Sequence, residues 1–438
     1  MNGQVQIVSQ TIAKPSSPTP NHLRHLQLSS LDQIMVPIFV PWQVFYPNSP
    51  GISNAERCER LRKSLSDTLT LFYPLAGRVR QHSHIDCNDE GVPFVEAKAK
   101  STIVEVLQSM HCNKFKELIP FQVQHDSDLC SFVQVTHFEC GGIVIGVGLS
   151  HKIADAVSDV TFFNSWAAIA RGERNNVLVP KFEAAKHFPP IDISDFDPCF
   201  EVVKDNRKIV SKRFVFDATS IKKLRDKYTE NYCSPTGNMI KPPTRVEVLT
   251  AFICSRVMAA TQLRADNSDT VYMVKHALDF RRRMDPPLSK QHIGNITFEP
   301  VVAETQIDTE DKYCYGVINQ MRRTLTSADT DYVKKFQEGD EQLNLMKDRA
   351  ERQRYKKVVS LSFTSFCWFP VYEIDFGWGK PEWIGSACWP YQNMFLFTDT
   401  KEKGGIEMNA NLLEEDMANF EKDVELAAIF ISQLSNPF

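Results

Sequence analysis

The segment SFVQVTHFECGGIVIGVGLSHKIADAVSDVTFFNSWAAIARG, residues 131–172, joins two strand patterns and a helix pattern in one continuous stretch. The runs SFVQVTHF and IVIGVGLS are rich in β-branched and aromatic residues, and residues 139–142 between them suit a hairpin turn. The next run, ADAVSDVTFFNSWAAIA, predicts a helix that ends before Gly172, because glycine is favoured just past a helix end. His151 therefore follows a strand directly and precedes a helix.

This position makes His151 a candidate general base. Imidazole has an unperturbed pKa of about 6.5, so its neutral form can take a proton from a hydroxyl as that oxygen attacks a carbonyl carbon. Gly146 and Gly148 in the preceding strand permit another group to approach closely. The His-x-x-x-Asp spacing is not diagnostic alone, because residues 82–86 repeat it in a polar stretch that we interpret as a surface loop. A core histidine hydrogen-bonded to the backbone is the alternative.

The rest of the chain alternates strand and helix patterns, which predicts a mixed α/β protein. With 438 residues, the chain is longer than a single hydrophobic core usually supports, and it suits two domains of roughly 200 residues each. An acidic, proline-bearing stretch at 188–205 is the expected linker, giving domains at 1–200 and 201–438. We also expect strands at 5–12, 34–46 and 211–217, and helices at 55–72, 244–260 and 331–357. Thr244 and Glu247 have capping-box spacing.

Composition and charge narrow the classes of partner. Hydrophobic residues make up 42% and charged residues 24% of the chain, as in globular proteins, and the net charge of −4 does not favour nucleic acid. The 11 cysteines form no CxxC pair, which favours free thiols in a reducing compartment over a set of disulfide bonds. The His and Cys residues also lack the spacing of metal ligands. The apolar stretch at 35–47 is broken by prolines and too short to span a bilayer. We expect a cytoplasmic protein without metal, membrane or nucleic-acid partners.

Two motifs together resemble a known family. HKIAD at 151–155 and DFGWGKP at 375–381 occur in the order and at the separation seen in the plant BAHD acyl-CoA-dependent acyltransferases. Further signatures agree in order: LSSLD at 28–32, FYPLAGR at 72–78, DCNDEGVPFVEA at 86–97, PTRVEVLTAF at 243–252, DFRRRMDPPL at 279–288 and GN at 294–295. The chain looks most similar to the alkaloid-acylating branch of that family.

The resemblance implies two similar mixed-sheet domains of the chloramphenicol acetyltransferase type, with a solvent channel between them. A segment near 365–390 would pack with the N-terminal domain. Acyl-CoA and an alcohol would meet at His151, the catalytic base, and the acyl group would pass directly between them without an acyl-enzyme. The protein would be a monomer and would bind no cofactor tightly. Asp155 would pair with Arg281 as a structural element. Asp375, Gly377 and Gly379 would fix the local backbone that shapes the CoA channel.

The remaining candidate positions follow the same family pattern. Thr364 and Asn295 would line the site, with the Thr364 hydroxyl directed at the oxyanion. The family TSW reads TSF here, so Phe366 keeps an aromatic surface without the indole N–H, and Trp368 offers apolar area where shikimate-accepting relatives often carry Arg. Both are acceptor-pocket candidates. Candidates for the CoA phosphates are Lys212, Arg213, Lys241, Thr244 and Arg245.

The sequence therefore predicts an O-acyltransferase, most simply an acetyltransferase that uses acetyl-CoA and a plant alkaloid or related specialised metabolite. Two alternatives stay open within the enzyme class: an N-acyltransferase, and a relative that uses malonyl- or aroyl-CoA. A catalytically silent small-molecule-binding relative is the alternative of another class. The acceptor and acyl donor lie beyond sequence reasoning alone.

Overall fold

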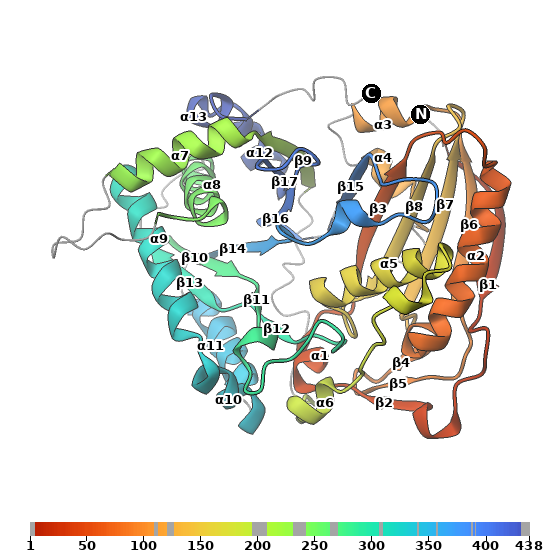
Figure 1. The fold of residues 1–438 in the computed structure, drawn as a ribbon. Coiled ribbons are helices and arrows are strands. Elements are labelled where there is room, and N and C mark those ends of the chain that lie inside the picture. Colours follow the sequence, from red (N-terminus) through yellow and green to blue (C-terminus); the bar gives the residue numbers. More distant parts are fainter. Residues whose placement is uncertain are drawn as a thin grey trace.

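Two six-stranded sheets, each carrying its own helices, form the two lobes of the molecule (Figure 1). The computed structural model describes residues 5–108, 113–120, 127–194, 208–230, 242–262, 270–305, 310–339, 341–355, 358–386, 389 and 391–430. Each sheet mixes parallel and antiparallel neighbours, so the predicted mixed α/β class with two similar sheets is confirmed.

The first sheet belongs to the N-terminal lobe. In spatial order its strands are β1 (Val5–Ala13), β6 (Val92–Ala99), β7 (Ser131–Phe138), β8 (Ile143–Ser150), β3 (Phe39–Tyr46) and β15 (Trp383–Ser386). The predicted hairpin at 131–150 is the antiparallel pair β7–β8, and every residue of these two strands is buried. Helices α2 (Asn54–Leu71) and α5 (Ala156–Ala170) pack against each other over this sheet. Both helices match their predicted positions.

Close packing explains the two glycines of β8. A methyl group placed on Gly148 would lie 2.3 Å from the Phe132 ring, and one on Gly146 would lie 2.1 Å from the Leu118 carbonyl oxygen. Both distances are below any normal contact, so the backbone approach needs glycine at these positions. The strand that precedes His151, β8, is therefore closely packed inside the N-terminal lobe.

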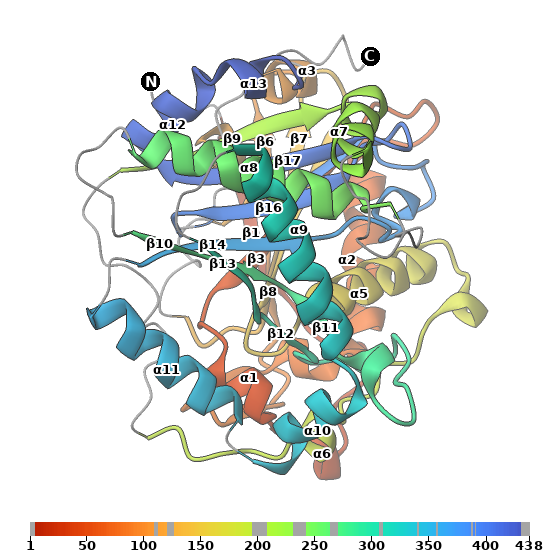
Figure 2. The ribbon, with the colours of Figure 1, turned by 90° about the vertical axis from the view of Figure 1, so that its left-hand side faces the viewer.

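The second sheet belongs to the C-terminal lobe. Its spatial order is β13 (Val301–Thr305), β10 (Val271–His276), β14 (Val358–Ser365), β16 (Met394–Asp399), β17 (Ile406–Leu413) and β9 (Ile209–Phe216). Its helices include α7 (Ala218–Glu230), α8 (Arg245–Gln262), α9 (Glu310–Ser327), α12 (Glu414–Glu421) and α13 (Val424–Ala427), and Figure 2 shows α8 and α9 lying over the sheet. The capping box at the start of α8 is present, with Glu247 N–H donating to the Thr244 hydroxyl over 3.2 Å.

Small elements complete the fold. Two short sheets contain β2 (His25–Gln27), β5 (His84–Asp86) and β4 (Arg78–Arg80), and β11 (Leu278–Asp279) with β12 (Thr297–Phe298). The other short helices are α1 (Ser30–Ile34), α3 (Ile103–Leu107), α4 (Asn113–Lys116) and α6 (Ala184–His187). A hydrophobic cluster that includes Leu31 and Ile34 of α1 with Leu278 and Phe280 joins the two halves of the chain.

Chain segments cross between the lobes. β15 pairs antiparallel with β3, and Ile374 and Phe376 belong to the N-terminal core (Figure 1). Tyr46 of β3 donates its hydroxyl proton to the Ile374 carbonyl over 2.6 Å. The segment 374–386 therefore lies in the N-terminal lobe although it follows most of the C-terminal lobe in sequence. Residues 195–205 of the expected linker lie outside the described residues.

Three local predictions need correction. The single helix predicted at 331–357 is replaced by two helices, α10 (Thr330–Glu338) and α11 (Glu341–Tyr355), because Gly339 adopts an extended conformation that ends α10. Residues 34–38 are not strand, since α1 ends at Ile34 and β3 begins at Phe39. The second His-x-x-x-Asp stretch, residues 82–86, was interpreted as a surface loop. Its residues 84–86 are instead strand β5, which pairs with β2 and β4, and Ile85 is buried there.

Candidate active site

A large cavity opens between the two sheets, and His151 is part of its wall. The cavity contains about 1800 Å³ of empty space, including the open solvent at its mouth. Residues from both lobes line it. The N-terminal lobe contributes Met35, Val36, Ile38, Val40, Ala154, Asp155, Ala156 and Asp159, and the chain after residue 270 contributes Lys275, Ala277, Phe298, Glu299, Ser360, Ser362, Thr364, Phe366, Trp389, Tyr391 and Met394, among others.

The backbone at His151 is fixed by the neighbouring strand. His151 follows β8 directly, and its amide donates to the Ile38 carbonyl over 2.7 Å, just before β3 begins. Residues 151–153 form a turn before α5, whose N-cap is Asp155. The imidazole therefore lies at the end of β8, in the wall of the cavity.

The imidazole orientation depends on Asn295. The His151 Nδ1 lies 3.0 Å from Asn295 Oδ1. The Asn295 Nδ2 faces two acceptors, Asp32 Oδ1 at 2.8 Å and the His151 carbonyl at 2.7 Å. Since the amide nitrogen must face these acceptors, its oxygen faces Nδ1, and Nδ1 must carry the proton. The lone pair of the neutral ring is then on Nε2.

Burial and hydrogen bonding shift the pKa of His151 in opposite directions. Burial lowers the pKa of His151 below 6.5, while the nearby Asp155 charge and the Asn295 hydrogen bond oppose this shift. The net direction is downward, so the ring is neutral near pH 7 and is able to accept a proton.

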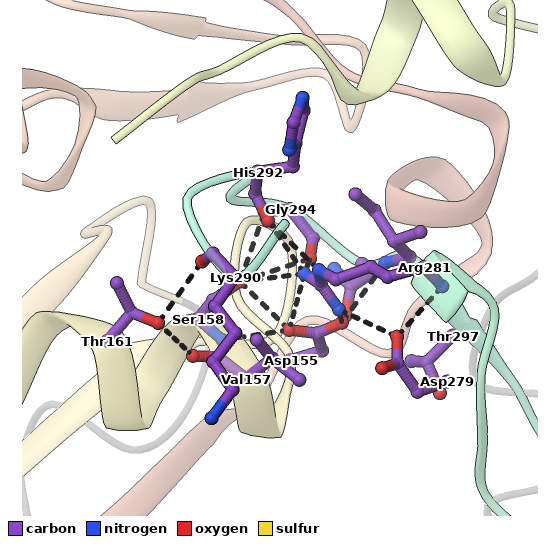
Figure 3. A network of polar contacts seen from close by, with 12 residues as sticks. Asp155, Val157, Ser158, Thr161, Asp279, Arg281, Lys290, His292, Gly294 and Thr297 are labelled. Carbon is purple, nitrogen blue, oxygen red and sulfur yellow. Dashed lines mark hydrogen bonds and ion pairs between the residues drawn. The ribbon is translucent and has the colours of Figure 1, made fainter. Parts of the chain in front are cut away.

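Asp155 pairs with Arg281 (Figure 3). Arg281 donates from Nη1 to Asp155 Oδ2 over 2.7 Å and from Nη2 to Oδ1 over 3.1 Å. Asp155 also caps α5 by accepting from the Ser158 amide over 3.0 Å, and it accepts from the Ile296 amide over 3.1 Å. Burial opposes ionisation of this carboxyl, but Arg281 and these donors outweigh it and lower its pKa below 3.8. Its two oxygens are therefore occupied by groups other than the imidazole.

Arg281 extends this network to the loop that carries Asn295. Its guanidinium donates to the carbonyls of His292 over 2.8 Å and Gly294 over 3.2 Å, and Figure 3 shows these contacts converging on one side of Asp155. Gly294 has a φ of 132°, and a Cβ there would lie 2.7 Å from Ala184 Cβ. The Asp155–Arg281 pair thus ties the start of α5 to the segment that positions the His151 partner.

Thr364 and Phe366 lie in the wall of the cavity that also contains His151. Thr364 is on β14, and Phe366 follows the end of that strand. The Phe366 ring packs edge-on against Trp42, with ring centroids 4.5 Å apart. The position that is Trp in the family pattern therefore presents apolar aromatic surface.

The structure contradicts the prediction that Trp368 lines the acceptor pocket. Trp368 is 82% exposed and is outside the cavity wall. Its φ of 73° turns the chain, its amide donates to Asp399 over 2.7 Å, and its ring lies 4.7 Å from the Arg245 guanidinium. This turn directs the ring outward, which sequence alternation alone does not reveal.

The DFGWG motif forms a turn on the N-terminal lobe, away from the cavity wall. The Asp375 carboxylate accepts from the amides of Gly377 over 2.7 Å and Gly379 over 3.0 Å. Both glycines have positive φ, 101° and 105°, in the region that favours glycine. Arg171 at the end of α5 donates to the Asp375 carbonyl. The motif therefore connects the crossing segment with the helix that follows His151.

The candidate phosphate ligands have partners within the chain. Lys212 pairs with Glu421 at 2.5 Å, and Arg245 pairs with Asp399 at 2.9 Å. The Thr244 amide donates to the Glu247 carboxylate over 2.6 Å, so this carboxylate occupies the start of α8. For these three residues, phosphate binding stays a prediction. Lys241 lies outside the described residues.

Arg213 does not fit the predicted phosphate role. It is 7% exposed, donates to the Leu107 carbonyl over 2.8 Å and lies 5.3 Å from the Trp383 ring. The alternation of side chains along β9 directs this residue into the contact between the lobes, where a solvated phosphate has no access.

Sequence reasoning missed several groups that line the cavity. Asp159 lies one helical turn after Asp155, and Lys275 and Glu299 form an ion pair at 3.3 Å. Trp389 also lines the cavity. The spacing of Asp155 and Asp159 was the one available signal, because residues four apart on a helix share a face. Nothing in the sequence linked Lys275 with Glu299.

One group of potential metal ligands lies outside this cavity. Cys58, Glu96 and His137 have ligand atoms within 4.8 Å of one another, a grouping the sequence spacing did not indicate. Glu96 already lies 3.1 Å from His137 Nε2, and the Arg62 guanidinium is 3.8 Å from the same carboxylate. The positively charged Arg62 side chain would compete with a metal ion for the Glu96 carboxylate. We therefore interpret these three residues as a polar cluster within the core.

Comparison with known proteins places this arrangement in a family. The Transferase family model matches residues 3–427. The chain is 34% identical to stemmadenine O-acetyltransferase of Catharanthus roseus, with 100% of both proteins covered. It is 35% identical to vinorine synthase of Rauvolfia serpentina, with 99% of this chain and 100% of that protein covered. The chain belongs to the BAHD acyltransferase family.

Solved structures agree with this BAHD membership. The crystal structure of vinorine synthase matches with a TM-score of 0.83 and 34% identity, covering 98% of this chain and 99% of that one. F. graminearum TRI101 complexed with coenzyme A and deoxynivalenol matches with a TM-score of 0.73 at 15% identity, covering 93% and 99%. This second likeness concerns the fold alone. The family prediction is confirmed, and the protein is an acyltransferase.

One further finding concerns the helices of this BAHD protein. Among those in the described part of the chain, none combines the length and the apolar character needed to cross a bilayer.

Proposed function

We propose that this BAHD protein transfers an acetyl group from acetyl-CoA to a hydroxyl of an alkaloid or a related plant metabolite. The observation that carries the proposal is His151 in a cavity shared by both lobes, with Nδ1 directed at Asn295. The curated relatives named above support the acetyl group and the alkaloid class, because one is a stemmadenine O-acetyltransferase. A limonoid 21-O-acetyltransferase of Citrus sinensis, 33% identical, supports a wider range of acceptor skeletons.

The reaction begins with proton removal. His151 Nε2 takes the hydroxyl proton as the acceptor oxygen attacks the thioester carbonyl carbon. Asn295 keeps the ring oriented throughout, because its amide oxygen accepts from Nδ1–H. The resulting tetrahedral intermediate carries the negative charge on the former carbonyl oxygen.

Collapse of the intermediate completes the transfer. The carbon–sulfur bond breaks, the acetyl ester is released, and the imidazolium of His151 returns its proton to the CoA thiolate. Thr364, in the same cavity wall, is the proposed hydroxyl donor to the oxyanion. Asp155 takes no part in these proton transfers, because Arg281, Ser158 and Ile296 occupy its oxygens.

The apolar wall favours an acceptor with a hydrophobic skeleton. The apolar side chains of the cavity lining include Met35, Val36, Ile38, Val40 and Phe366. Burial of such a skeleton contributes roughly 25 cal/mol per Å² of apolar surface. A polycyclic alcohol gains from this surface, whereas a small, highly charged acceptor does not.

The direct test is turnover with a panel of plant alcohols. The purified protein is incubated with acetyl-CoA, thiol release is followed by colour, and each product is identified by the mass of one added acetyl group. We expect thiol release and ester formation in equal amounts, and we expect His151→Ala to abolish both while the melting temperature stays close to that of the wild type. Malonyl-CoA, benzoyl-CoA and amine acceptors serve as comparisons.

Two results would contradict the proposal. One is CoA binding without any acyl transfer across the panel, which would favour a binding protein. The other is full activity in the His151→Ala variant, which would remove the imidazole from the mechanism.

A further inference from the structure

Asp159 is a buried carboxyl group in the wall of the acceptor cavity with one oxygen unpartnered. Its side chain is 1% exposed, and it lies on α5, one turn after Asp155. Trp42 Nε1 donates to Asp159 Oδ2 over 3.1 Å. The other oxygen, Oδ1, has no hydrogen-bond partner. A buried polar atom without a partner is costly, which marks this carboxyl for a role that packing does not explain.

The other acidic residues of the cavity wall each have a cation. Asp155 pairs with Arg281 at 2.7 Å, and Glu299 pairs with Lys275 at 3.3 Å. Within the described part of the chain, Asp159 is the acidic residue of this wall with no ion pair. A positive charge beside Asp159 would therefore come from a group that enters the cavity.

The surroundings of Asp159 suit an organic cation. Ala156 and Val40 line the nearby wall, and the Trp42 indole that holds Asp159 packs edge-on against Phe366. Burial raises the pKa of Asp159 well above 3.8, the Trp42 hydrogen bond opposes this shift, and the Asp155 charge adds to it. Burial thus favours the protonated form of this carboxyl, and a cation placed beside it favours the ionised form.

We propose that Asp159 selects acceptors that carry a tertiary amine, by pairing its Oδ1 with the ammonium N–H while a hydroxyl elsewhere on the same molecule faces His151. This inference rests on the proposed O-acyltransferase function and narrows its acceptor to basic amino alcohols. A tertiary amine fits better than a primary one, because it offers one N–H to one free oxygen and is not itself acylated to an amide. Asp159 is thus a specificity residue of the acceptor site and takes no part in bond making.

The test compares matched alcohols with and without the amine. Tropine, a bicyclic tertiary amino alcohol, is paired with borneol, a neutral bicyclic alcohol, and larger amino alcohols are paired with their carbocyclic counterparts. The kcat/KM of each is measured with acetyl-CoA for the wild type and for Asp159→Asn. The asparagine keeps the size of the side chain and an oxygen for Trp42 but carries no negative charge. We expect kcat/KM for the amines to fall on the order of 10- to 100-fold, with the neutral alcohols within about twofold.

Asp159→Leu is the second variant, because it removes both oxygens and fills the space with apolar atoms. We expect it to fold and to give the same loss of preference for amines, with neutral alcohols still acetylated. Equal losses for amines and neutral alcohols in both variants would show that Asp159 acts on the structure of the site and would overturn the inference. An unchanged ratio of the two kcat/KM values would also overturn it.

A binding measurement separates this inference from the proposed function. Calorimetry with each amine and its neutral counterpart is carried out on the wild type and on Asp159→Asn without acyl donor. If the wild type releases no thiol with any alcohol yet binds amines more tightly than Asp159→Asn does, the proposed function fails and the cation site stands. If the two proteins bind amines equally, the cation site fails whatever the turnover shows.

Discussion

The Asp155→Ala substitution provides a demanding test of the division between structural and catalytic residues. The wild-type carboxylate is 4% exposed, and its partner Arg281 is 2% exposed, so removal of Asp155 leaves a guanidinium charge in the interior without its main counter-ion. Breaking a buried pair in this way costs about 3–5 kcal/mol. The loss of the α5 N-cap is part of the same substitution, and a cap of this kind is worth about 1 kcal/mol.

These two losses together predict the change in melting temperature. One kcal/mol shifts the melting temperature of a domain with roughly 150–250 residues by about 2–4 °C, so the loss of about 4–6 kcal/mol in Asp155→Ala should lower it by roughly 8–24 °C. Activity should fall with it, because Arg281 holds the carbonyls of His292 and Gly294, beside Asn295. The assay is thermal unfolding followed by circular dichroism, with thiol release measured on the same samples well below the transition.

An exposed ion pair supplies the control. Lys222 and Asp226 lie one turn apart on α7 with side chains 74% and 54% exposed, and such pairs contribute about 0–1 kcal/mol. Asp226→Ala should therefore leave both melting temperature and activity near wild type. A folded Asp155→Ala protein with the wild-type melting temperature and no turnover would refute the reasoning, since it would make Asp155 a catalytic partner of His151.

The pH dependence of this pair has a defined sign. The pKa of Asp155 is lower in the folded protein than its usual value of 3.8, so the unfolded chain binds a proton first as the pH falls. The contribution of Asp155 to stability is therefore fully present above that value and is lost as the pH drops through the lower, folded pKa. At pH 7 the ion pair makes its full contribution.

Three further predictions concern His151, Asn295 and Gly148. Because burial lowers the pKa of His151 and only the neutral ring accepts a proton, kcat/KM should rise with pH through an apparent pKa below 6.5 and then stay level; a midpoint above 7 would contradict this. Asn295→Ala removes the Nδ1 acceptor and should lower kcat on the order of tenfold with little change in KM for acetyl-CoA; unchanged kcat in steady-state kinetics would exclude the orienting role. Gly148→Ala places a methyl group 2.3 Å from Phe132 and should cost about 1–3 kcal/mol in chemical denaturation, whereas Gly316→Ala in α9, with nothing within 4 Å of the new methyl, should not destabilise the protein.

Local patterns predicted the elements that hold the catalytic histidine. The β7–β8 hairpin, the α5 helix that follows it and the capped start of α8 all lie where propensity, turn residues and spacing indicated. Each of these elements is fixed by residues close in sequence, so a single chain displays the evidence directly. The alternating patterns and the chain length also predicted a mixed α/β protein with two domains, whereas the similarity of the two sheets and the pairing of Asp155 with Arg281 were expected from family resemblance.

The errors occurred where local patterns compete with the surroundings. Residues 331–357 carry one helical composition, yet the conformation of Gly339 divides them and buried Val333 and Phe336 of α10 pack against the cluster that joins the two halves. Trp368 was expected in the acceptor pocket because shikimate-accepting relatives often carry Arg at this position, but its own positive φ sends the ring to the surface. A side-chain direction that depends on one backbone angle has no signature in residue type.

The sequence by itself determined that His151 stands between a strand and a helix, in a chain long enough for two lobes. Only the tertiary structure decided what surrounds that imidazole. Asn295, from the second half of the chain, contacts the ring and is itself held by Asp32 from the first half, and Asp159 lies in the wall of the same cavity without a hydrogen-bond partner for Oδ1. The physical reason is that hydrogen bonds and desolvation depend on distance in space, so groups separated by hundreds of residues set the proton position and charge of a site that local sequence only locates.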